Sequence, residues 1–263
     1  MIQYQQPYSF IDYPLFTDTL DELNTSSNGN APQSSILVNT INQYSYCVAN
    51  EDAAFKESLQ HSDILLPDGV AVVAAARLLT GKKIKKIAGA DLHQYLLTDL
   101  NNKNGSCFYL GASDETLAKI KSRMAFEYPN VKVETYSPPY KKDFSTEDNQ
   151  KMVEAVNAFK PDVVFVGMTA PKQEKWAYEH KTKLDTKIIC TIGAVFDFYA
   201  GTVQRPGDVY VNLGLEWFGR LVKEPKRLWK RYLYFGPVFV GLMLKEKVKK
   251  TFSRAQSLDK VLV

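Results

Sequence analysis

The alternation of short β-branched runs with longer amphipathic segments over residues 34–193 constrains the fold more than any other feature of this sequence. Strands are predicted for six apolar runs, at 34–40, 63–67, 106–112, 131–136, 162–168 and 187–193. Helices are predicted for the segments that follow, at 43–60, 69–79, 91–101, 114–128, 146–159 and 171–181. The pattern is typical of an α/β fold, with a Rossmann-like parallel sheet and helices on both of its faces.

Charge divides the chain into two parts. Residues 213–263 carry 12 Lys and Arg against 4 Asp and Glu, whereas residues 1–212 carry 21 against 25. We therefore expect an α/β domain at 1–212 and a C-terminal basic amphipathic helical appendage at 213–263. The excess predicts an acidic partner for the tail, which is an anionic membrane, a nucleic acid or a phosphorylated ligand.

The cysteines and the N-terminus favour a cytoplasmic protein. Cys47, Cys107 and Cys190 lie far apart in apolar contexts without a CxxC pair, which is typical of buried reduced thiols. The first residues lack the basic region and apolar core of a signal peptide, and no run approaches the ~18 apolar residues of a spanning helix.

Polar residues follow four of the predicted strands, where ligands bind in open parallel sheets. These residues are Thr40 and Asn42, then Asp68, then Gly111, and finally Lys172 with Gln173. Each also has a purely structural explanation, because Thr40 or Asn42 can cap the next helix and Asp68 in Pro-Asp-Gly is a common turn and capping residue. Their convergence at one sheet edge favours a substrate site.

Six stretches between Thr40 and Leu233 are specific in combination. They read LPDGVAVVAAARLL, IAGADL, FYLGASDETLAKIKSRMAFEYPNVKV, PDVVFVGMTAPKQEKWAYEH, GAVFDFYAGTVQRP and LGLEWFGRLVKEPKRLWKRYL. In this order they resemble the bacterial WecG/TagA/CpsF glycosyltransferases. The resemblance implies an inverting enzyme that moves N-acetylmannosamine or a related hexose from a UDP-sugar to a polyprenyl-diphosphate-linked saccharide. It also implies a place at the inner face of the plasma membrane, in teichoic acid, capsule or exopolysaccharide synthesis.

The resemblance also implies roles for individual residues. Asp68 corresponds to the proposed catalytic base, Thr40 and Asn42 lie near the acceptor, and Gln173 lies at the nucleotide-sugar side. The matching motifs contribute three further residues that we expect to bind substrate, Lys86, Asp91 and Asp197. Arginines of the tail close over the leaving diphosphate and map onto Arg220, Arg227 and Arg231.

Three positions depart from the family pattern. Ala71 replaces a glycine, Ala74 replaces a tryptophan, and Lys86 replaces an arginine, so that a point charge stands where the family has a bidentate fork. These changes leave the reaction class intact but affect what we expect of sugar specificity and of packing near the acceptor.

The chemistry agrees with this assignment. Inverting transfer needs a carboxylate as general base, and the leaving UDP needs a metal or cationic groups to stabilise its charge. The sequence has no DxD motif, and His61, His93 and His180 are solitary, as is typical of surface or supporting residues. We therefore expect no metal and no cofactor, with arginines acting on the leaving group.

The tail residues that would do this interleave with aromatic residues. Arg220, Arg227 and Arg231 are seven and four positions apart, which places them on one face of a continuous helix, although Pro225 either breaks this helix or starts a second one. Aromatic and basic residues together suit a bilayer interface. The alternative is an amphipathic helix that packs on the core and exposes a solvated charged face.

Two other classes of protein compete with this interpretation. A basic tail with aromatic residues is also compatible with a nucleic-acid-binding or nucleotide-binding α/β protein. Because the motif-bearing loops lie in the acidic part of the chain, we do not expect nucleic acid as a partner. A dinucleotide-binding oxidoreductase is disfavoured, since the turn FYLGASDETL has one glycine where that fingerprint needs three.

Overall fold

The computed structural model describes residues 8–23, 35–203 and 215–259. Its eight strands form one sheet in the order β1-β2-β4-β3-β8-β7-β5-β6. The strands are β1 (Tyr8–Phe10), β2 (Tyr13–Leu15), β3 (Ile36–Ile41), β4 (Ile64–Pro67), β5 (Ser106–Gly111), β6 (Lys132–Tyr136), β7 (Val163–Gly167) and β8 (Ile188–Thr191). The six predicted strands and the α/β class are therefore confirmed.

The sheet is not parallel throughout, which differs from the prediction. β1 pairs antiparallel with β2, and β2 then joins β4 in parallel through Leu15 and Leu65. The hairpin is held because Phe10, Tyr13 and Leu15 are buried in the core. These strands have three residues each, too few to show a hydrophobic periodicity in the sequence.

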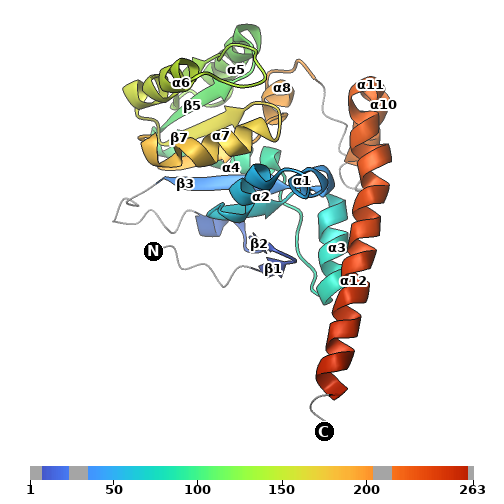
Figure 1. Ribbon diagram of the computed structural model, residues 1–263. Coiled ribbons are helices and arrows are strands. Elements are labelled where there is room, and N and C mark those ends of the chain that lie inside the picture. Colours follow the sequence, from blue (N-terminus) through green and yellow to red (C-terminus); the bar gives the residue numbers. More distant parts are fainter. Residues whose placement is uncertain (1–7, 24–34, 204–214, 260–263) are drawn as a thin grey trace.

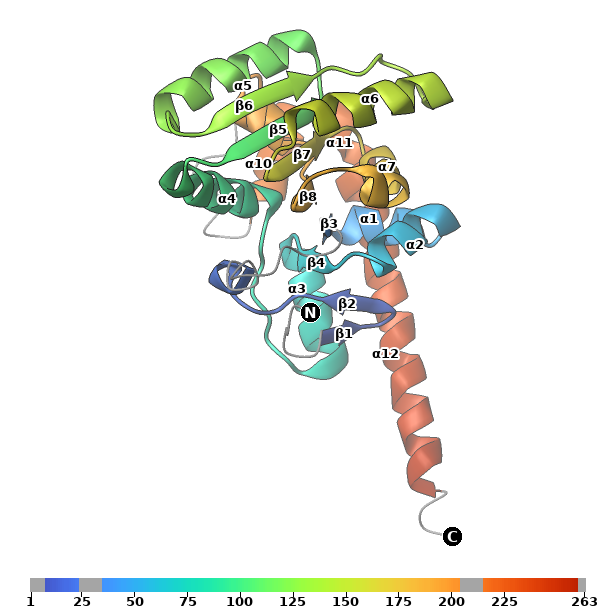
Figure 2. The same ribbon diagram turned by 90° about the vertical axis from the view of Figure 1, so that its left-hand side faces the viewer.

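Helices cover both faces of the central strands, as predicted (Figures 1 and 2). Successive residues of β7 point to opposite faces, so that Phe165 packs with one layer and Val164 with the other. The first layer contains α4 (Gly89–Lys103), α5 (Asp114–Glu127) and the short α8 (Val195–Tyr199). The second contains α6 (Thr146–Phe159) and α7 (Lys172–His180), which ends in a 3-10 turn at Lys181–Lys183.

The single helix predicted for residues 43–60 is wrong, because the structure has two. They are α1 (Gln43–Ala49) and α2 (Ala53–Gln60). The Oδ1 atom of Asp52 accepts a hydrogen bond of 3.0 Å from the backbone N–H of Phe55, which makes Asp52 the N-cap of α2. An aspartate in this position satisfies a free N–H of the first turn and favours a new helix start.

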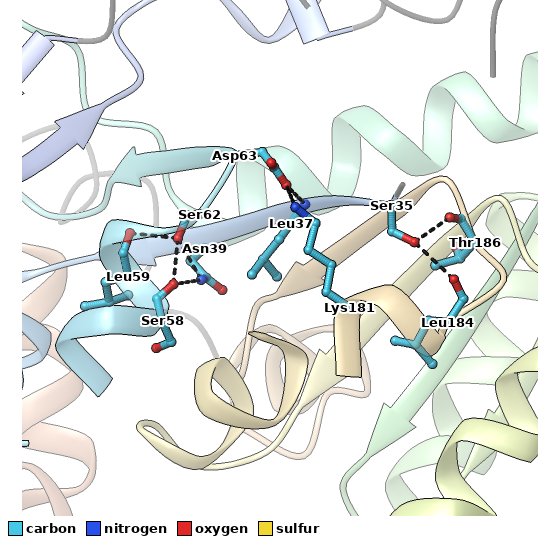
Figure 3. Close-up of polar contacts among 10 residues, drawn as sticks. All are labelled: Ser35, Leu37, Asn39, Ser58, Leu59, Ser62, Asp63, Lys181, Leu184 and Thr186. Atoms are coloured by element: carbon cyan, nitrogen blue, oxygen red, sulfur yellow. Dashed lines mark hydrogen bonds and ion pairs between the residues drawn. The ribbon is translucent and has the colours of Figure 1, made fainter. Parts of the chain in front are cut away.

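A buried polar network around Asn39 joins β3 to α2 and the residues that follow α2 (Figure 3), and Thr191 extends it to β8. The side-chain amide of Asn39 donates to the Ser62 hydroxyl at 2.8 Å and to the Ser58 carbonyl at 3.2 Å. Its carbonyl oxygen accepts a hydrogen bond of 2.6 Å from the Thr191 hydroxyl. Because Asn39, Ser58 and Thr191 are fully buried, these bonds fix the position of β3 against its neighbours.

The tail folds as a chain of helices against the sheet domain. It comprises α10 (Glu216–Lys223), α11 (Pro225–Trp229), a π-helical turn (Lys230–Tyr234) and α12 (Phe235–Asp259). Pro225 occupies the first position of α11. It therefore starts a second helix rather than lying within one continuous helix. The expected domain boundary at 212/213 lies outside the described residues.

One side of α12 belongs to the core. Phe235, Phe239 and Met243, spaced by four residues, are buried in the cluster that also contains Tyr46. Figure 1 shows α12 running alongside α3 (Val70–Thr80) and extending beyond it, and α12 also contacts α1. Within the described ranges, none of the helices combines the length and the apolar composition needed to cross a membrane.

Candidate active site

A cleft of about 1890 Å³ lies at the carboxyl ends of the parallel strands. Residues that follow β3, β4, β5, β7 and β8 line it on the sheet side, and α10, α11, the π-helical turn and α12 line it on the tail side. Ten of the twelve residues predicted to be catalytic or substrate-binding line this cleft. They are Thr40, Asn42, Asp68, Lys86, Lys172, Gln173, Asp197, Arg220, Arg227 and Arg231. Of the six residues expected to converge at the strand ends, Gly111 does not line the cleft and the other five do. The roles of all twelve residues stay predictions.

Asp68 is held at the end of β4 by the neighbouring strand. Its backbone N–H donates to the Ile41 carbonyl at 2.9 Å, and the Pro67 carbonyl accepts from Ile87 at 3.0 Å. Gly69 then adopts a φ of +104°, a conformation that favours glycine, and α3 begins at the next residue. The Pro-Asp-Gly sequence thus turns the chain while keeping the carboxylate at the cleft.

Arg231 enters the same cleft from the tail. Its guanidinium lies 5.1 Å from the centre of the Tyr44 ring, a cation–π contact. Burial lowers the pKa of Arg231, and Arg220 acts in the same direction, while Asp68 favours the charged form. The Nε atom is buried and has no hydrogen-bond partner among the residues that the structure describes. Such a donor is costly unless a ligand supplies the acceptor.

The charges of the other two arginines act on Asp197. The Arg220 guanidinium lies 4.9 Å from the Phe198 ring centre, and Arg227 forms an ion pair with Glu224. Burial raises the pKa of Asp197, whereas the charges of Arg227 and Arg220 act to lower it. The three arginines thus form a cationic wall, although they come from three elements rather than from one continuous helix.

Gln173 is fixed on the opposite wall by bonds at both ends of its amide. Its Oε1 atom accepts from the Met168 backbone N–H at 3.1 Å, and its Nε2 atom donates to Glu174 Oε1 at 2.8 Å. A Cβ atom at Gly193 would lie 3.1 Å from Gln173 Oε1, and the φ of Gly193 is +43°, so a side chain there would be strained and crowded. The amide orientation is therefore determined by the fold.

Glu174 is a residue of the cleft that sequence reasoning missed. It is 2% exposed, and its Oε2 atom has no hydrogen-bond partner within the described part of the chain. Burial raises the pKa of Glu174 to about 7. The signal available in the sequence was its position directly after Gln173 in PKQE, but nothing there indicated burial.

Three other candidate residues line the cleft, namely Asn42, Lys172 and Thr40. Asn42 caps α1, because its Oδ1 atom accepts from the backbone N–H groups of Tyr44 and Ser45, both at 3.0 Å. This capping role, which the sequence left open, is present together with access to the cleft. The Lys172 ammonium lies 3.5 Å from the Phe144 ring centre, and burial lowers the pKa of Lys172. Thr40 is partly buried at the end of β3.

Two predicted site residues do not line the cleft. The Asp91 carboxylate accepts from the Ala88 backbone N–H at 2.9 Å, near the start of α4. Gly111 has a φ of +124°, and a Cβ atom there would lie 2.3 Å from the Gly167 carbonyl oxygen. Both residues thus have a clear architectural role, one at a helix start and one where β5 meets β7.

The histidines do not gather at the cleft. His93 is buried and its Nε2 atom is 2.7 Å from the Tyr109 hydroxyl, while His180 is buried against the Trp176 ring. Neither is at the surface, because His93 on α4 and His180 at the end of α7 lie on the buried sides of their helices. In the described ranges, no group of three or more His, Cys, Asp and Glu side chains is arranged to hold a metal ion.

This arrangement combines a carboxylate with cationic groups across one cleft. A carboxylate at a strand end is suited to take a proton from a hydroxyl group. Guanidinium groups are suited to hold the oxygens of a phosphate or diphosphate. The cleft thus has the groups needed for transfer from a phosphorylated donor to a hydroxyl acceptor.

Comparison with known proteins agrees with this chemistry. The profile described as the glycosyl transferase WecG/TagA/CpsF family matches residues 9–253. An N-acetylglucosaminyldiphosphoundecaprenol N-acetyl-beta-D-mannosaminyltransferase of Bacillus subtilis (strain 168) is 32% identical over 216 residues, which cover 82% of each chain. Proteins with the same name from Bacillus spizizenii and Staphylococcus aureus (strain MW2) are 29% and 26% identical. The matches cover 76% and 84% of this chain and 75% and 84% of those relatives.

Proposed function

This chain belongs to the WecG/TagA/CpsF family of glycosyl transferases, and on that premise we propose that it transfers a sugar from a UDP-sugar to a polyprenyl-diphosphate-linked saccharide. The names of the relatives favour N-acetylmannosamine or a related hexose as the sugar and a lipid-linked N-acetylglucosamine as the acceptor. The product then enters cell-surface polysaccharide synthesis. The observation that carries this proposal is the placement of Asp68 and the three tail arginines in one cleft.

In this reaction Asp68 acts as the general base. It removes the proton from the acceptor hydroxyl while that oxygen bonds to the anomeric carbon. The bond between the anomeric carbon and the UDP oxygen breaks on the opposite side, so the configuration inverts. From an α-linked nucleotide sugar such an inversion gives a beta linkage, which is the linkage in the names of the relatives.

The tail arginines act on the leaving group. UDP departs with additional negative charge on its terminal phosphate, which Arg220, Arg227 and Arg231 neutralise. The buried Nε of Arg231 gains an acceptor at this moment. Because these three cations already stand at the cleft, the proposal needs no metal ion and no cofactor.

We also propose that the tail binds the enzyme to the inner face of the plasma membrane, as a peripheral protein. The far part of α12 exposes Val248 and Phe252, which are 54% and 68% exposed. Lysines at 245, 247, 249 and 250 are exposed on the same part of the helix. Apolar side chains next to lysines favour binding to an anionic bilayer surface.

A screen against a panel of UDP-sugars tests this function. Purified full-length protein is incubated with each donor and a short-chain lipid-diphosphate acceptor, and UDP release and the glycosylated product are measured together. One donor should give both signals in equal amounts. Failure of every donor, combined with a shift of single-stranded DNA by the same protein, would favour the nucleic-acid-binding alternative.

A further inference from the structure

A second groove, of about 690 Å³, runs along the outer side of α3. Its lining is mostly apolar and consists of Val70, Val73, Ala74, Arg77, Leu78 and Lys86. Five of these six lie on one face of α3, because they are spaced by three and four residues. Val70 and Leu78 are 43% and 42% exposed, which is unusual for a helix whose opposite face is already buried in the core.

This groove is continuous with the active-site cleft. Val70 and Lys86 line both of them. Val70 is two residues beyond Asp68, so the groove leaves the cleft directly beside the proposed base. A ligand whose hydroxyl lies at Asp68 is thus able to extend from the cleft along α3.

We propose that this groove binds the first isoprene units of the acceptor's polyprenyl chain, with Lys86 next to the acceptor diphosphate. The inference rests on the proposed function and adds a binding site for the lipid part of the acceptor. Lys86 lines both the cleft and the groove, whereas Val73, Ala74 and Leu78 line only the groove. A cation therefore stands between the cleft and the apolar lining, as the diphosphate stands between the saccharide and the apolar chain of such a lipid.

The charges of the two sites support this assignment. The proposed reaction brings two diphosphates to one cleft, one in the donor and one in the acceptor, and their repulsion requires cations on both sides. Arg220, Arg227 and Arg231 supply one set from the tail. Lys86 supplies a cation on the α3 side, where it lines both the cleft and the groove. Lysines 82, 83 and 85 are exposed in the same loop.

The far end of the groove leads toward the membrane-facing part of the tail. The Lys247 ammonium donates a hydrogen bond of 2.8 Å to the Leu78 carbonyl, which joins α12 to α3. In Figure 1 the two helices lie side by side, and α12 continues past the end of α3. A chain that follows α3 therefore leaves the protein next to Val248, where we propose that the bilayer begins.

Two soluble acceptors that differ only in chain length test the groove. Both carry the same saccharide and diphosphate, one with a single isoprene unit and one with three, at concentrations below micelle formation and without membranes. For the wild-type protein, KM should be lower for the longer chain by about tenfold or more, because each buried CH₂ group adds to binding.

Leu78→Glu should remove most of this difference, since it places a charge in the groove. The KM for the short acceptor should change much less, because Leu78 lies eight residues along α3 from Val70 and is beyond the reach of a single isoprene unit. The affinity for UDP should stay unchanged. Leu78→Met is the matched control, because it keeps the apolar lining. Phe126→Glu is the second control, since Phe126 is 88% exposed on α5, outside the groove and the cleft.

The possible outcomes distinguish failure of the proposed groove from failure of the proposed reaction. Equal KM values for both chains in the wild-type protein would overturn the groove and leave the proposed function standing. Transfer to neither acceptor would overturn the proposed function and the groove with it. If Leu78→Glu kept the chain-length preference but lost binding to acceptor-free anionic vesicles, the groove would contact bilayer lipid and the proposal would be wrong.

Discussion

Gln173 donates a hydrogen bond of 2.8 Å to one carboxyl oxygen of Glu174, and the other oxygen of Glu174 is buried without a partner among the described residues. Burial raises the pKa of this carboxyl from 4.5 to about 7. The charged group that acts on it is Arg231, from the π-helical turn, which favours the ionised form and partly opposes the effect of burial. Glu174 thus changes its charge near neutral pH.

This pKa predicts a loss of stability as the pH rises from 5 to 8. In that range the unfolded chain has released the proton of Glu174, whereas the folded protein still holds it until the pH passes about 7. Folding therefore becomes less favourable by about 3 kcal/mol. Urea unfolding at several pH values measures this, and Glu174→Gln, which keeps the bond from Gln173, should lack the change. Equal pH dependence in both proteins would contradict the prediction.

The catalytic role of Asp68 is tested by Asp68→Asn. Turnover should fall by ~10²-fold or more, because general-base contributions are of this order, while UDP affinity should stay nearly the same. Steady-state kinetics and calorimetry with UDP measure the two effects. Asp185→Asn is the control, since this exposed carboxylate lies before β8, at the other end of the strands. Near-normal turnover of Asp68→Asn would remove it from the mechanism.

The network at Asn39 predicts a large effect on stability (Figure 3). Asn39→Ala should lower the free energy of unfolding by about 2–3 kcal/mol, because it removes three buried hydrogen bonds and leaves the Thr191 hydroxyl without its acceptor. Thr191→Val should cost less, and Thr191→Ser should cost least, since the serine keeps the hydroxyl that bonds to Asn39. Urea unfolding at one pH compares the three. If Asn39→Ala left the free energy of unfolding unchanged, water would have replaced the side-chain amide.

Much of the fold was predictable because its signals are local. The apolar run of β7, for example, is buried at every residue, as expected for a strand in the middle of a parallel sheet. The β1–β2 hairpin was not predictable, because it depends on tertiary packing of Phe10 and Leu15. The break before α2 depends on a single cap, Asp52, in a segment whose apolar periodicity is otherwise compatible with one helix.

The candidate site was predictable where strand ends determine it. Asp68 and Gln173 reach the cleft because each follows a parallel strand. Glu174 was missed, since burial of a charged residue depends on the packing around it and leaves no local pattern. The tail arginines were expected on one helix face, but Pro225 and the π-helical turn separate them into three elements.

Activity should not depend on a metal ion. The arginines at the cleft supply the positive charge that a metal would otherwise provide for the leaving UDP. UDP release is measured after dialysis against EDTA and again after Mg²⁺ or Mn²⁺ is added. Rates that agree within error support the prediction, whereas loss in EDTA followed by recovery with a metal would show that a metal takes part.

The tail is predicted to have two separable roles, and the structure shows where to cut it. Phe239 and Met243 are 2% exposed and belong to the core, so removal of all of α12 would damage the fold. A chain that ends after Leu244 keeps these residues and all three arginines. It loses the exposed lysines and the apolar residues that follow.

The chain that ends after Leu244 should remain folded and should keep its turnover on a soluble acceptor. Its binding to anionic vesicles should weaken strongly, because each basic residue near such a surface contributes about 1 kcal/mol. Vesicle binding of the full-length protein should also fall with salt, since charges are screened over about 10 Å at 0.1 M ionic strength. Arg231→Ala should do the opposite, with a large loss of turnover and nearly normal vesicle binding. If both variants lost the two properties together, docking and catalysis would not be separable in this tail.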